Sequence, residues 1–220
     1  MHSYQNLIIL QYLYKIQTLG FSYIEHFQPN QENFLEEVSS LDELTQSIHS
    51  CHLCDLSKTR KQSMGGYGNQ YSDIMILDYV VSREQENMKD YYGGRGGELL
   101  NNMIKDILQK NKEDIFYTHC VKCKVFDKKD MIQMAYNSCQ SYLYTQINLI
   151  KPKIIIVLGK EAYEIFTNDK GNFENVRGHI VDFSSYKIFP IYHPEYLLRN
   201  PKLQQITKKD LQRVQTFIKI

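Results

Sequence analysis

Four of the five cysteines in this chain have the spacing of a metal site. Cys51 and Cys54 form a C-x-x-C pair, and Cys123 and Cys139 follow far downstream. Because thiolates hold tetrahedral zinc and iron–sulfur clusters, two close and two distant cysteines predict a site that fastens the N-terminal segment to the rest of the domain. Scattered buried thiols are the alternative, since a free cysteine packs as a small hydrophobic side chain. The fifth cysteine, Cys120, is not needed for four ligands.

The composition predicts a cytoplasmic protein of ordinary domain size. The 220 residues are 42% hydrophobic and 23% charged, which suffices for a core without disulfides. The apolar residues 7–10 are interrupted at once by polar ones, so we expect no export signal, and no apolar run could span a bilayer. We therefore expect reduced thiols and no membrane partner. The net charge of +1 means that a polyanion must be bound by a local patch.

After residue 73 the sequence pattern alternates between predicted strands and helices. Strands are predicted at 74–81, 114–121, 153–159, 178–183 and 187–192, and helices after the glycine-rich segment 93–97 and at 130–150, 160–166 and 206–218. This alternation predicts an α/β fold, a three-layer α/β/α sandwich with a central, mostly parallel sheet. Residues 51–220 are predicted to form this domain and residues 1–50 a helical extension. In the extension, apolar spacing within 7–16 predicts one helix and a capping box at 40–43 predicts another.

Side chains that could contact a flat polar ligand gather near the predicted carboxyl ends of the strands, where parallel sheets bind ligands. They comprise a carboxylate, two aromatic rings and two imidazoles: Asp78, Tyr79, Tyr92, His119 and His193. The site is therefore expected in the segments that follow Val81, Val121, Gly159 and Ile191.

These segments and the cysteines resemble family 4 uracil-DNA glycosylases, the iron–sulfur branch of the uracil-DNA glycosylase superfamily. The resemblance covers residues 48–213, and the matching pieces occur in the family's order. They are Cys51-x-x-Cys54-x-Leu56-x-x-x-Arg60, Gly66-Tyr67-Gly68-Asn69, Gly94-Arg95-Gly96-Gly97-Glu98-Leu99-Leu100, Lys122-Cys123, Cys139-x-x-x-Leu143, the segment 151–162, Arg177-Gly178 and His193-Pro194-x-Tyr196-Leu197-Leu198-Arg199-Asn200.

The resemblance implies a cofactor. It implies that Cys51, Cys54, Cys123 and Cys139 ligate a [4Fe–4S] cluster that is largely structural. Taken by themselves, four thiolates suit zinc equally well.

The resemblance also implies hydrolysis of the N-glycosidic bond of a nucleotide that is flipped out of the DNA. His193 occupies the position of the histidine that stabilises the leaving base anion, which is charge that develops in the transition state. Gly94, Arg95 and Arg199 are expected to contact the nucleic acid. Basic residues within 122–129 and 199–213 are either further DNA contacts or solvated helix faces. We expect a monomer that acts on damaged bases in single- or double-stranded DNA.

The resemblance breaks at the positions that read the base and handle water. Tyr79 replaces the glutamate of the family's Gly-Glu-Ala-Pro-Gly motif. Asp78 is the candidate substitute, although the alternation of side chains along a strand predicts that it points elsewhere. Tyr92 retains a ring for stacking on the base. His119 replaces the asparagine that reads uracil, and it offers a different pattern of donors and acceptors.

Two main functions follow. The first is a DNA glycosylase of base excision repair that hydrolyses the bond to uracil or another modified base, with an atypical site that uses His193 with His119 or Asp78. The alternative is an iron–sulfur nucleic-acid-binding protein without glycosylase turnover, and a zinc-stabilised interaction protein is a third possibility. The intact motif at 193–199 favours the glycosylase, because a cluster scaffold alone does not need it.

Overall fold

The computed structural model of the chain describes residues 38–125 and 129–218. They belong to a compact unit that runs from Val38 to Ile220. The helix predicted within residues 7–16 lies outside the described residues, whereas the helix predicted from the capping box is present as α2 (Leu41–His49), with Ser40 as its N-cap. Among the described helices, none is long and apolar enough to cross a membrane.

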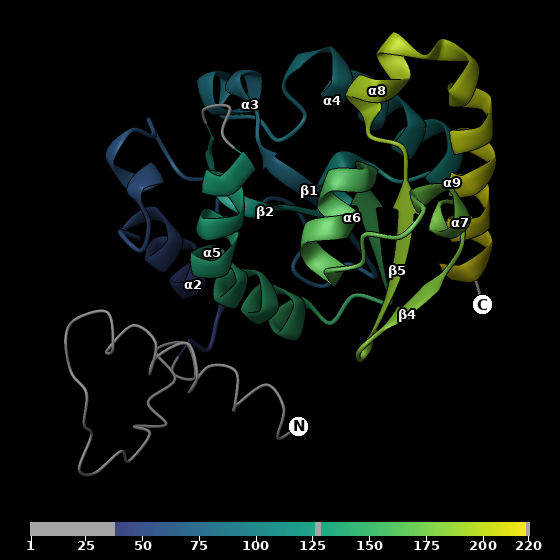
Figure 1. The fold of residues 1–220 in the computed structure, drawn as a ribbon. Helices are drawn as coiled ribbons and strands as arrows, with labels where there is room; N and C mark the ends of the chain where they lie inside the picture. Colours follow the sequence, from purple (N-terminus) through teal and green to yellow (C-terminus); the bar gives the residue numbers. More distant parts are fainter. Residues whose placement is uncertain (1–37, 126–128, 219–220) are drawn as a thin grey trace. The chain divides into compact units, whose positions relative to one another are not determined.

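A five-stranded sheet forms the centre of this unit (Figure 1). Its strands are β1 (Ile74–Val81), β2 (Phe116–Lys124), β3 (Ile154–Leu158), β4 (Val181–Phe183) and β5 (Tyr186–Ile191). The strand order is β2-β1-β3-β5-β4, in which the first four strands are parallel and the edge strand β4 runs antiparallel to β5. The central strands are apolar and buried along their length, as a parallel sheet covered on both faces requires.

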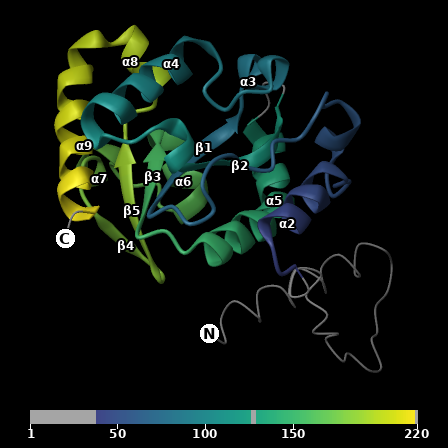
Figure 2. The ribbon, with the colours of Figure 1, turned by 180° about the vertical axis from the view of Figure 1, so that it is seen from behind.

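Helices cover both faces of the sheet (Figures 1 and 2). One face carries α5 (Lys129–Ile150) and α6 (Gly159–Thr167), and the other carries α4 (Gly94–Met103), its π-helical continuation η2 (Ile104–Leu108) and α9 (Gln204–Ile218). The shorter elements are α3 (Arg83–Met88), α7 (Phe173–Val176), α8 (Pro194–Arg199) and the single turns η1 (Asp55–Lys58), η3 (Lys112–Asp114) and η4 (Pro201–Leu203). The predicted three-layer α/β/α sandwich with a mostly parallel sheet is confirmed.

The second strand extends further than its sequence pattern predicts. The prediction ends this strand at Val121, but β2 continues to Lys124. Side chains from Phe116 to Cys123 are buried, and pairing with β1 continues past an irregularity between Val80 and Val81. Cys123 consequently lies within the sheet and not in a loop after it.

Helix α4 begins inside the glycine-rich segment 93–97 and not after it. A Cβ atom on Gly97 would lie 2.2 Å from the carbonyl oxygen of Tyr92, and one on Gly96 would lie 3.1 Å from Cγ of Glu195. Since glycine alone has no Cβ, it permits these approaches. The segment therefore packs the first turn of α4 closely against the preceding loop and against α8.

Candidate functional site

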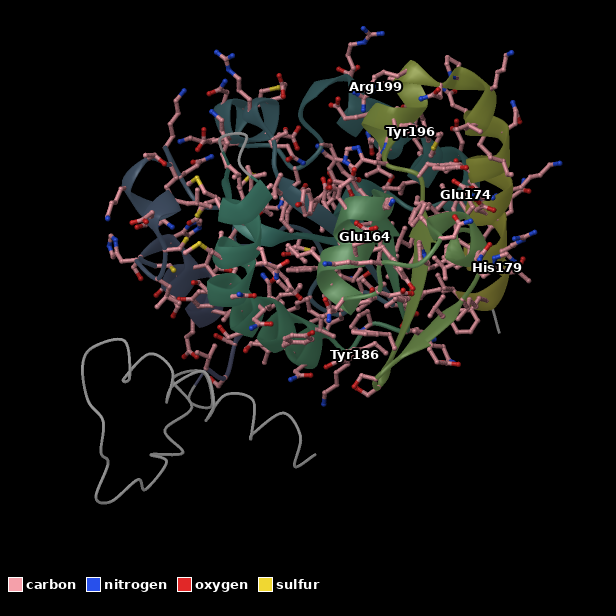
Figure 3. All side chains as sticks on the ribbon, in the orientation of Figure 1. Glu164, Glu174, His179, Tyr186, Tyr196 and Arg199 are labelled. Atoms are coloured by element: carbon pink, nitrogen blue, oxygen red, sulfur yellow. The ribbon has the colours of Figure 1, made fainter. Side chains whose placement is uncertain are left out.

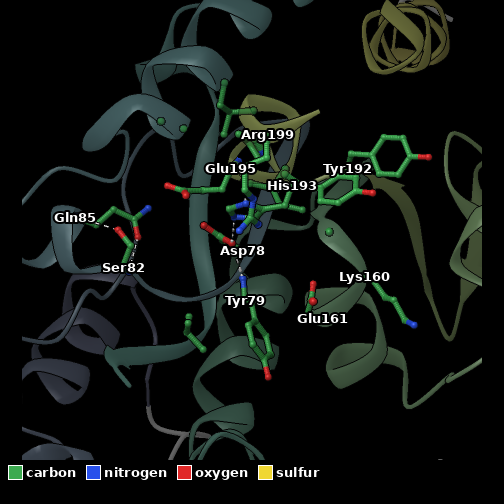
Figure 4. Close-up of a pocket in the computed structure, with 18 of the residues that line it drawn as sticks. Asp78, Tyr79, Ser82, Gln85, Lys160, Glu161, Tyr192, His193, Glu195 and Arg199 are labelled. Atoms are coloured by element: carbon green, nitrogen blue, oxygen red, sulfur yellow. Dashed lines mark hydrogen bonds and ion pairs between the residues drawn. The ribbon is translucent and has the colours of Figure 1, made fainter. Parts of the chain in front are cut away.

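A pocket of about 860 Å³ opens at the carboxyl ends of β1, β3 and β5 (Figure 4). Residues from 78–82, 158–161 and 192–196 line it, together with the start of α4 and residues 172–174. Its volume is in the range of small-molecule sites. Three of the four strand ends expected from the sequence thus border the pocket. The fourth strand, β2, contributes Tyr117, whereas its carboxyl end leads to Cys123.

Asp78 and His193 face each other in this pocket (Figure 4). Nε2 of His193 lies 3.2 Å from Oδ1 of Asp78. The same Oδ1 accepts the backbone N–H of Tyr79 at 2.7 Å, and Oδ2 accepts the hydroxyl of Tyr117 at 2.7 Å. The Asp78 side chain is buried, and that of His193 is 31% exposed, so a ligand can reach the imidazole. The fold brings together the two side chains that the sequence suggests for catalysis.

The start of α8 fixes the position of His193. His193 is the N-cap residue, and its Nδ1 accepts the backbone N–H of Glu195 at 3.1 Å. Pro194 follows at the first helical position, where its missing N–H has no cost. Because Nδ1 accepts a hydrogen bond, the neutral ring carries its hydrogen on Nε2. One nitrogen therefore caps the helix, and the other presents a hydrogen to Asp78.

Neighbouring charges keep Asp78 ionised. Burial alone would raise the pKa of Asp78, but the charge and hydrogen bond of His193, the nearby His119 and the Tyr117 hydroxyl together lower it to about 2. Burial alone would lower the pKa of His193, but the charge and hydrogen bond of Asp78 outweigh burial and raise it. The Glu195 N–H favours the neutral ring, yet Nε2 carries a hydrogen in both protonation states. The pocket therefore combines a carboxylate with an imidazole N–H donor.

The expectation that Asp78 points away from the site is wrong. Asp78 and Tyr79 leave β1 in opposite directions, as alternation requires, but Asp78 is the one directed at His193 (Figure 4). Alternation places the two side chains on opposite faces of β1, but it does not determine which face His193 approaches. That face is set by the end of β5 and the start of α8. Tyr79 is half-buried and also lines the pocket.

Two of the residues predicted to bind the base, Tyr92 and His119, are not among the described residues that line the pocket. His119 is fully buried, and its Nε2 lies 3.1 Å from Oε1 of Gln85. Burial lowers the pKa of His119 to about 4, so the ring is neutral at pH 7. The Tyr92 ring is buried edge-on against Tyr117, with ring centroids 5.2 Å apart. Gln85 and Tyr117 line the pocket where His119 and Tyr92 are expected to do so.

Gln85 and Tyr117 are not among the predicted pocket residues, although a local sequence pattern points to each of them. Ser82 and Gln85 form a capping box at the start of α3, in which each backbone N–H donates to the other side chain, at 2.9 and 3.1 Å. This pairing directs Gln85 back toward the end of β1. Tyr117 lies two residues before His119 and therefore on the same face of β2.

The residues predicted to contact DNA lie at different distances from the pocket. Arg199, at the end of α8, is exposed and lines the pocket rim (Figures 3 and 4). Gly94 and Arg95 form the first turn of α4 but do not line the pocket, and the Arg95 side chain is exposed. Arg199 is the predicted DNA contact that is also part of the pocket.

Lys122, in the basic stretch 122–129, is not available to DNA. Its side chain is fully buried, and its ammonium donates to Oγ1 of Thr118 at 2.6 Å, to Oε1 of Gln146 at 2.6 Å and to a backbone carbonyl at 2.7 Å. These bonds tie β2 to α5, so this lysine stabilises the interior. The rest of the stretch includes residues 126–128, which lie outside the described part of the chain.

The four predicted cysteine ligands line one small cavity. Cys51 and Cys54 come from the segment between α2 and η1, Cys123 from β2 and Cys139 from α5. Within residues 38–125 and 129–218, no three ligand side chains are close enough to hold a metal ion as they stand. Cys120 is buried in the core and does not line the cavity.

The surroundings of the sulfur atoms fit a thiolate-bound metal centre. Arg60 donates from Nη1 to Sγ of Cys123 at 3.2 Å and from Nη2 to the carbonyls of His49 and Cys51 at 2.9 and 2.8 Å. Burial raises the pKa of Cys123, and that of Cys139 to about 12, so both thiols stay protonated in the absence of metal. The positive charge of a metal would reverse this preference. Four cysteines around one cavity, with a cation directed at a sulfur, suit an iron–sulfur cluster or zinc.

Comparisons with known proteins point to one family. Residues 66–217 match the family model of the uracil DNA glycosylase superfamily. The chain is 30% identical over 185 residues to the type-4 uracil-DNA glycosylase of Saccharolobus solfataricus, covering 80% of this chain and 86% of that protein. The type-4 uracil-DNA glycosylases of Sulfurisphaera tokodaii and Archaeoglobus fulgidus are 29% and 27% identical, again over 80% of this chain and over 84% and 92% of theirs. The chain therefore belongs to the uracil DNA glycosylase superfamily.

Proposed function

We propose that this protein is a DNA glycosylase of base excision repair that hydrolyses the N-glycosidic bond of uracil or another modified base in DNA. The observation that carries the proposal is the contact between Asp78 and His193 in a pocket at the strand ends of a superfamily member. The relatives named type-4 uracil-DNA glycosylases support the same reaction class.

In this reaction the bond between C1′ of the sugar and the base nitrogen breaks, and the electron pair leaves with the base. A water oxygen then bonds to C1′ and the water loses a proton. In our proposal the Nε2–H of His193 turns from Asp78 to the departing base and stabilises its negative charge by a hydrogen bond, so the proton stays on the imidazole and the base leaves as an anion. Asp78 balances the positive charge on the sugar and accepts the proton from water. The base reaches both side chains after it has flipped out of the DNA stack.

The base contacts differ from those that the family motifs imply. Tyr79 lines the pocket, and we assign a substrate contact to it and not to Tyr92 or His119. Oε1 of Gln85 and Nε2 of His119 lie 3.1 Å apart and bind each other. Neither of these two atoms is therefore free to read the edge of uracil. The test of function therefore needs more than one base.

Arg199 is our candidate for a phosphate contact, because it is exposed at the pocket rim. A guanidinium at this place is suited to hold the strand from which a base has flipped. Contacts from Gly94 and Arg95 stay predictions, as do a monomeric state and a cytoplasmic location.

A [4Fe–4S] cluster held by Cys51, Cys54, Cys123 and Cys139 is the proposed cofactor. These residues belong to separate segments around one cavity, so a cluster there would join the segment after α2 to β2 and α5. The cluster would act on stability, since the cysteines are not among the residues that line the pocket. Visible absorption together with iron, sulfide and zinc analysis of anaerobically purified protein distinguishes a cluster from zinc.

The function is tested with a panel of DNA substrates that contain uracil, hypoxanthine, xanthine or an alkylated base, in single and double strands. We expect strand scission after alkali for at least one base, because hydrolysis leaves an abasic site. His193→Ala should abolish scission. His179→Ala, which changes an exposed histidine that does not line the pocket, should retain it.

Two outcomes would contradict the proposal. Absence of cleavage across the panel, combined with salt-sensitive DNA binding, would favour the iron–sulfur binding protein without turnover. Equal activity in His193→Ala and the wild type would exclude the proposed role of the imidazole.

A further inference from the structure

The two oxygens of Asp78 have different partners. Oδ1 faces His193, which follows β5, at 3.2 Å and accepts the backbone N–H of Tyr79, in β1, at 2.7 Å. Oδ2 accepts the hydroxyl of Tyr117, in β2, at 2.7 Å. A carboxylate turns easily about its terminal bond, because this torsion has broad minima. The Tyr79 N–H holds Oδ1 from the backbone side, and the Tyr117 hydroxyl is the contact that holds the far oxygen against this rotation.

The register of the sheet explains why this contact comes from a tyrosine. Asp78 is paired with His119 and Ile76 with Tyr117, so Tyr117 and Asp78 are diagonal neighbours on one face of the sheet. The tyrosine side chain spans this diagonal, since its hydroxyl lies 2.7 Å from Oδ2 of Asp78. A phenylalanine at this position would fill the same space without reaching the carboxylate.

The Tyr117 hydroxyl is itself held in one direction. The rings of Tyr91 and Tyr92 pack against the Tyr117 ring at centroid distances of 5.6 and 5.2 Å. Nε2 of Gln85 donates to the Tyr117 hydroxyl oxygen at 3.4 Å, which leaves the hydroxyl hydrogen for Asp78. Burial raises the pKa of Tyr117 well above its ordinary value, so the phenol remains a donor.

We propose that Tyr117 is a positioning residue for the reaction, which orients the Asp78 carboxylate toward His193 through its hydroxyl. The inference rests on the proposed glycosylase function. It adds a residue from β2 that acts on the substrate only through Asp78.

The test compares Tyr117→Phe with Tyr92→Phe in the full-length protein, on the DNA substrate that the panel identifies. Tyr117→Phe removes one hydrogen bond to a charged group and should lower kcat about 10- to 100-fold. KM should change less than about twofold, because the ring that lines the pocket is retained. Tyr92→Phe removes a buried hydroxyl that has no hydrogen-bond partner among the described residues, and kcat should stay within about twofold of the wild type.

A double-mutant cycle separates positioning from packing. If Tyr117 acts through Asp78, Tyr117→Phe should have little further effect on kcat in the Asp78→Asn background. Independent, multiplying effects of the two substitutions would overturn the proposal, as would equal losses in Tyr117→Phe and Tyr92→Phe.

Crystal structures of the two variants give a readout that does not depend on activity. In Tyr117→Phe we expect Oδ1 of Asp78 and Nε2 of His193 to move beyond hydrogen-bond distance, whereas Tyr92→Phe should preserve their contact. An unchanged Asp78 in Tyr117→Phe would refute the positioning role. If the wild type cleaves no base, the proposed function fails, but this comparison still decides what Tyr117 does.

Discussion

The cysteine cavity and the Asp78–His193 pocket are built by different means. The cavity gathers four side chains of one type from the segment after α2, from β2 and from α5. The pocket depends on side chains of different types that satisfy one another: Tyr117 binds Asp78, Asp78 binds His193, and Gln85 binds His119.

This difference explains why one region keeps the family pattern and the other does not. A thiolate ligand has no substitute of similar size and softness, so each of the four cysteines would be required individually by the proposed cluster. A buried polar network requires only that every donor and acceptor is satisfied, and a change at one position can be matched by changes at its neighbours. In this chain Asp78 is satisfied by Tyr117, and His119 by Gln85.

The largest effect is expected at the cavity. Cys139→Ala removes one of four proposed ligands, and we expect loss of the cluster and of several kcal/mol of stability, since metal binding is coupled to folding. Iron and sulfide analysis and chemical denaturation measure the two effects. Cys120→Ala removes an equally buried thiol outside the cavity, and it should keep the full iron content and cost about 1 kcal/mol. Full iron content in Cys139→Ala would exclude Cys139 as a ligand.

The next largest effect is expected at Asp78. Asp78→Asn replaces the carboxylate by a neutral amide of the same shape and should lower kcat about 100-fold. Because the pKa of Asp78 is lowered from 3.8 to about 2, its charge is present above the ordinary value and is lost only as the pH falls toward about 2. The wild-type kcat should therefore show no loss from protonation of Asp78 between about pH 5 and pH 8. A pH–rate profile measures this, and an acidic limb in this range that disappears in Asp78→Asn would contradict it.

A smaller effect is expected at His119, and its substitution tests whether this residue contacts the base. His119→Asn restores the family's residue, but His119 does not line the pocket. We expect kcat/KM for uracil to change less than about threefold, and the free energy of unfolding to fall by about 1–2 kcal/mol because the contact with Gln85 is lost. Both are measured on the purified variant. A tenfold gain in uracil excision would mean that position 119 reaches the base.

The smallest effect is expected at the pocket rim. Arg199→Ala should reduce the slope of log affinity for DNA against log salt concentration by about 1, because one phosphate contact is lost. Lys153, whose ion pair with Asp73 lies at the amino end of β3, is the control, and Lys153→Ala should leave the slope unchanged. Equal slopes in Arg199→Ala and the wild type would remove Arg199 from the DNA interface.

Much of the fold follows from local patterns. β1 has the predicted bounds, α5 begins one residue before its predicted start, and β3 lies within its predicted range. Each is a long apolar or periodic segment whose pattern depends little on its neighbours. The predicted bounds are wrong where tertiary contacts set the end of an element. One example is β2, which continues to Lys124 because it pairs with β1.

The strand–helix alternation, the family resemblance and the four cysteines can be recognised from residue types and their spacing, because periodicity and ligand chemistry depend on these alone. Three features depend on the packing of distant segments: Asp78 contacts His193, Tyr117 holds the far oxygen of this carboxylate, and His119 lies outside the pocket lining. Asp78 and His193 are 115 residues apart in the chain, and no local pattern encodes which face of β1 the end of β5 will approach. The identity of a buried polar side chain gives its bonding capacity, and the packing of distant strands chooses its partner.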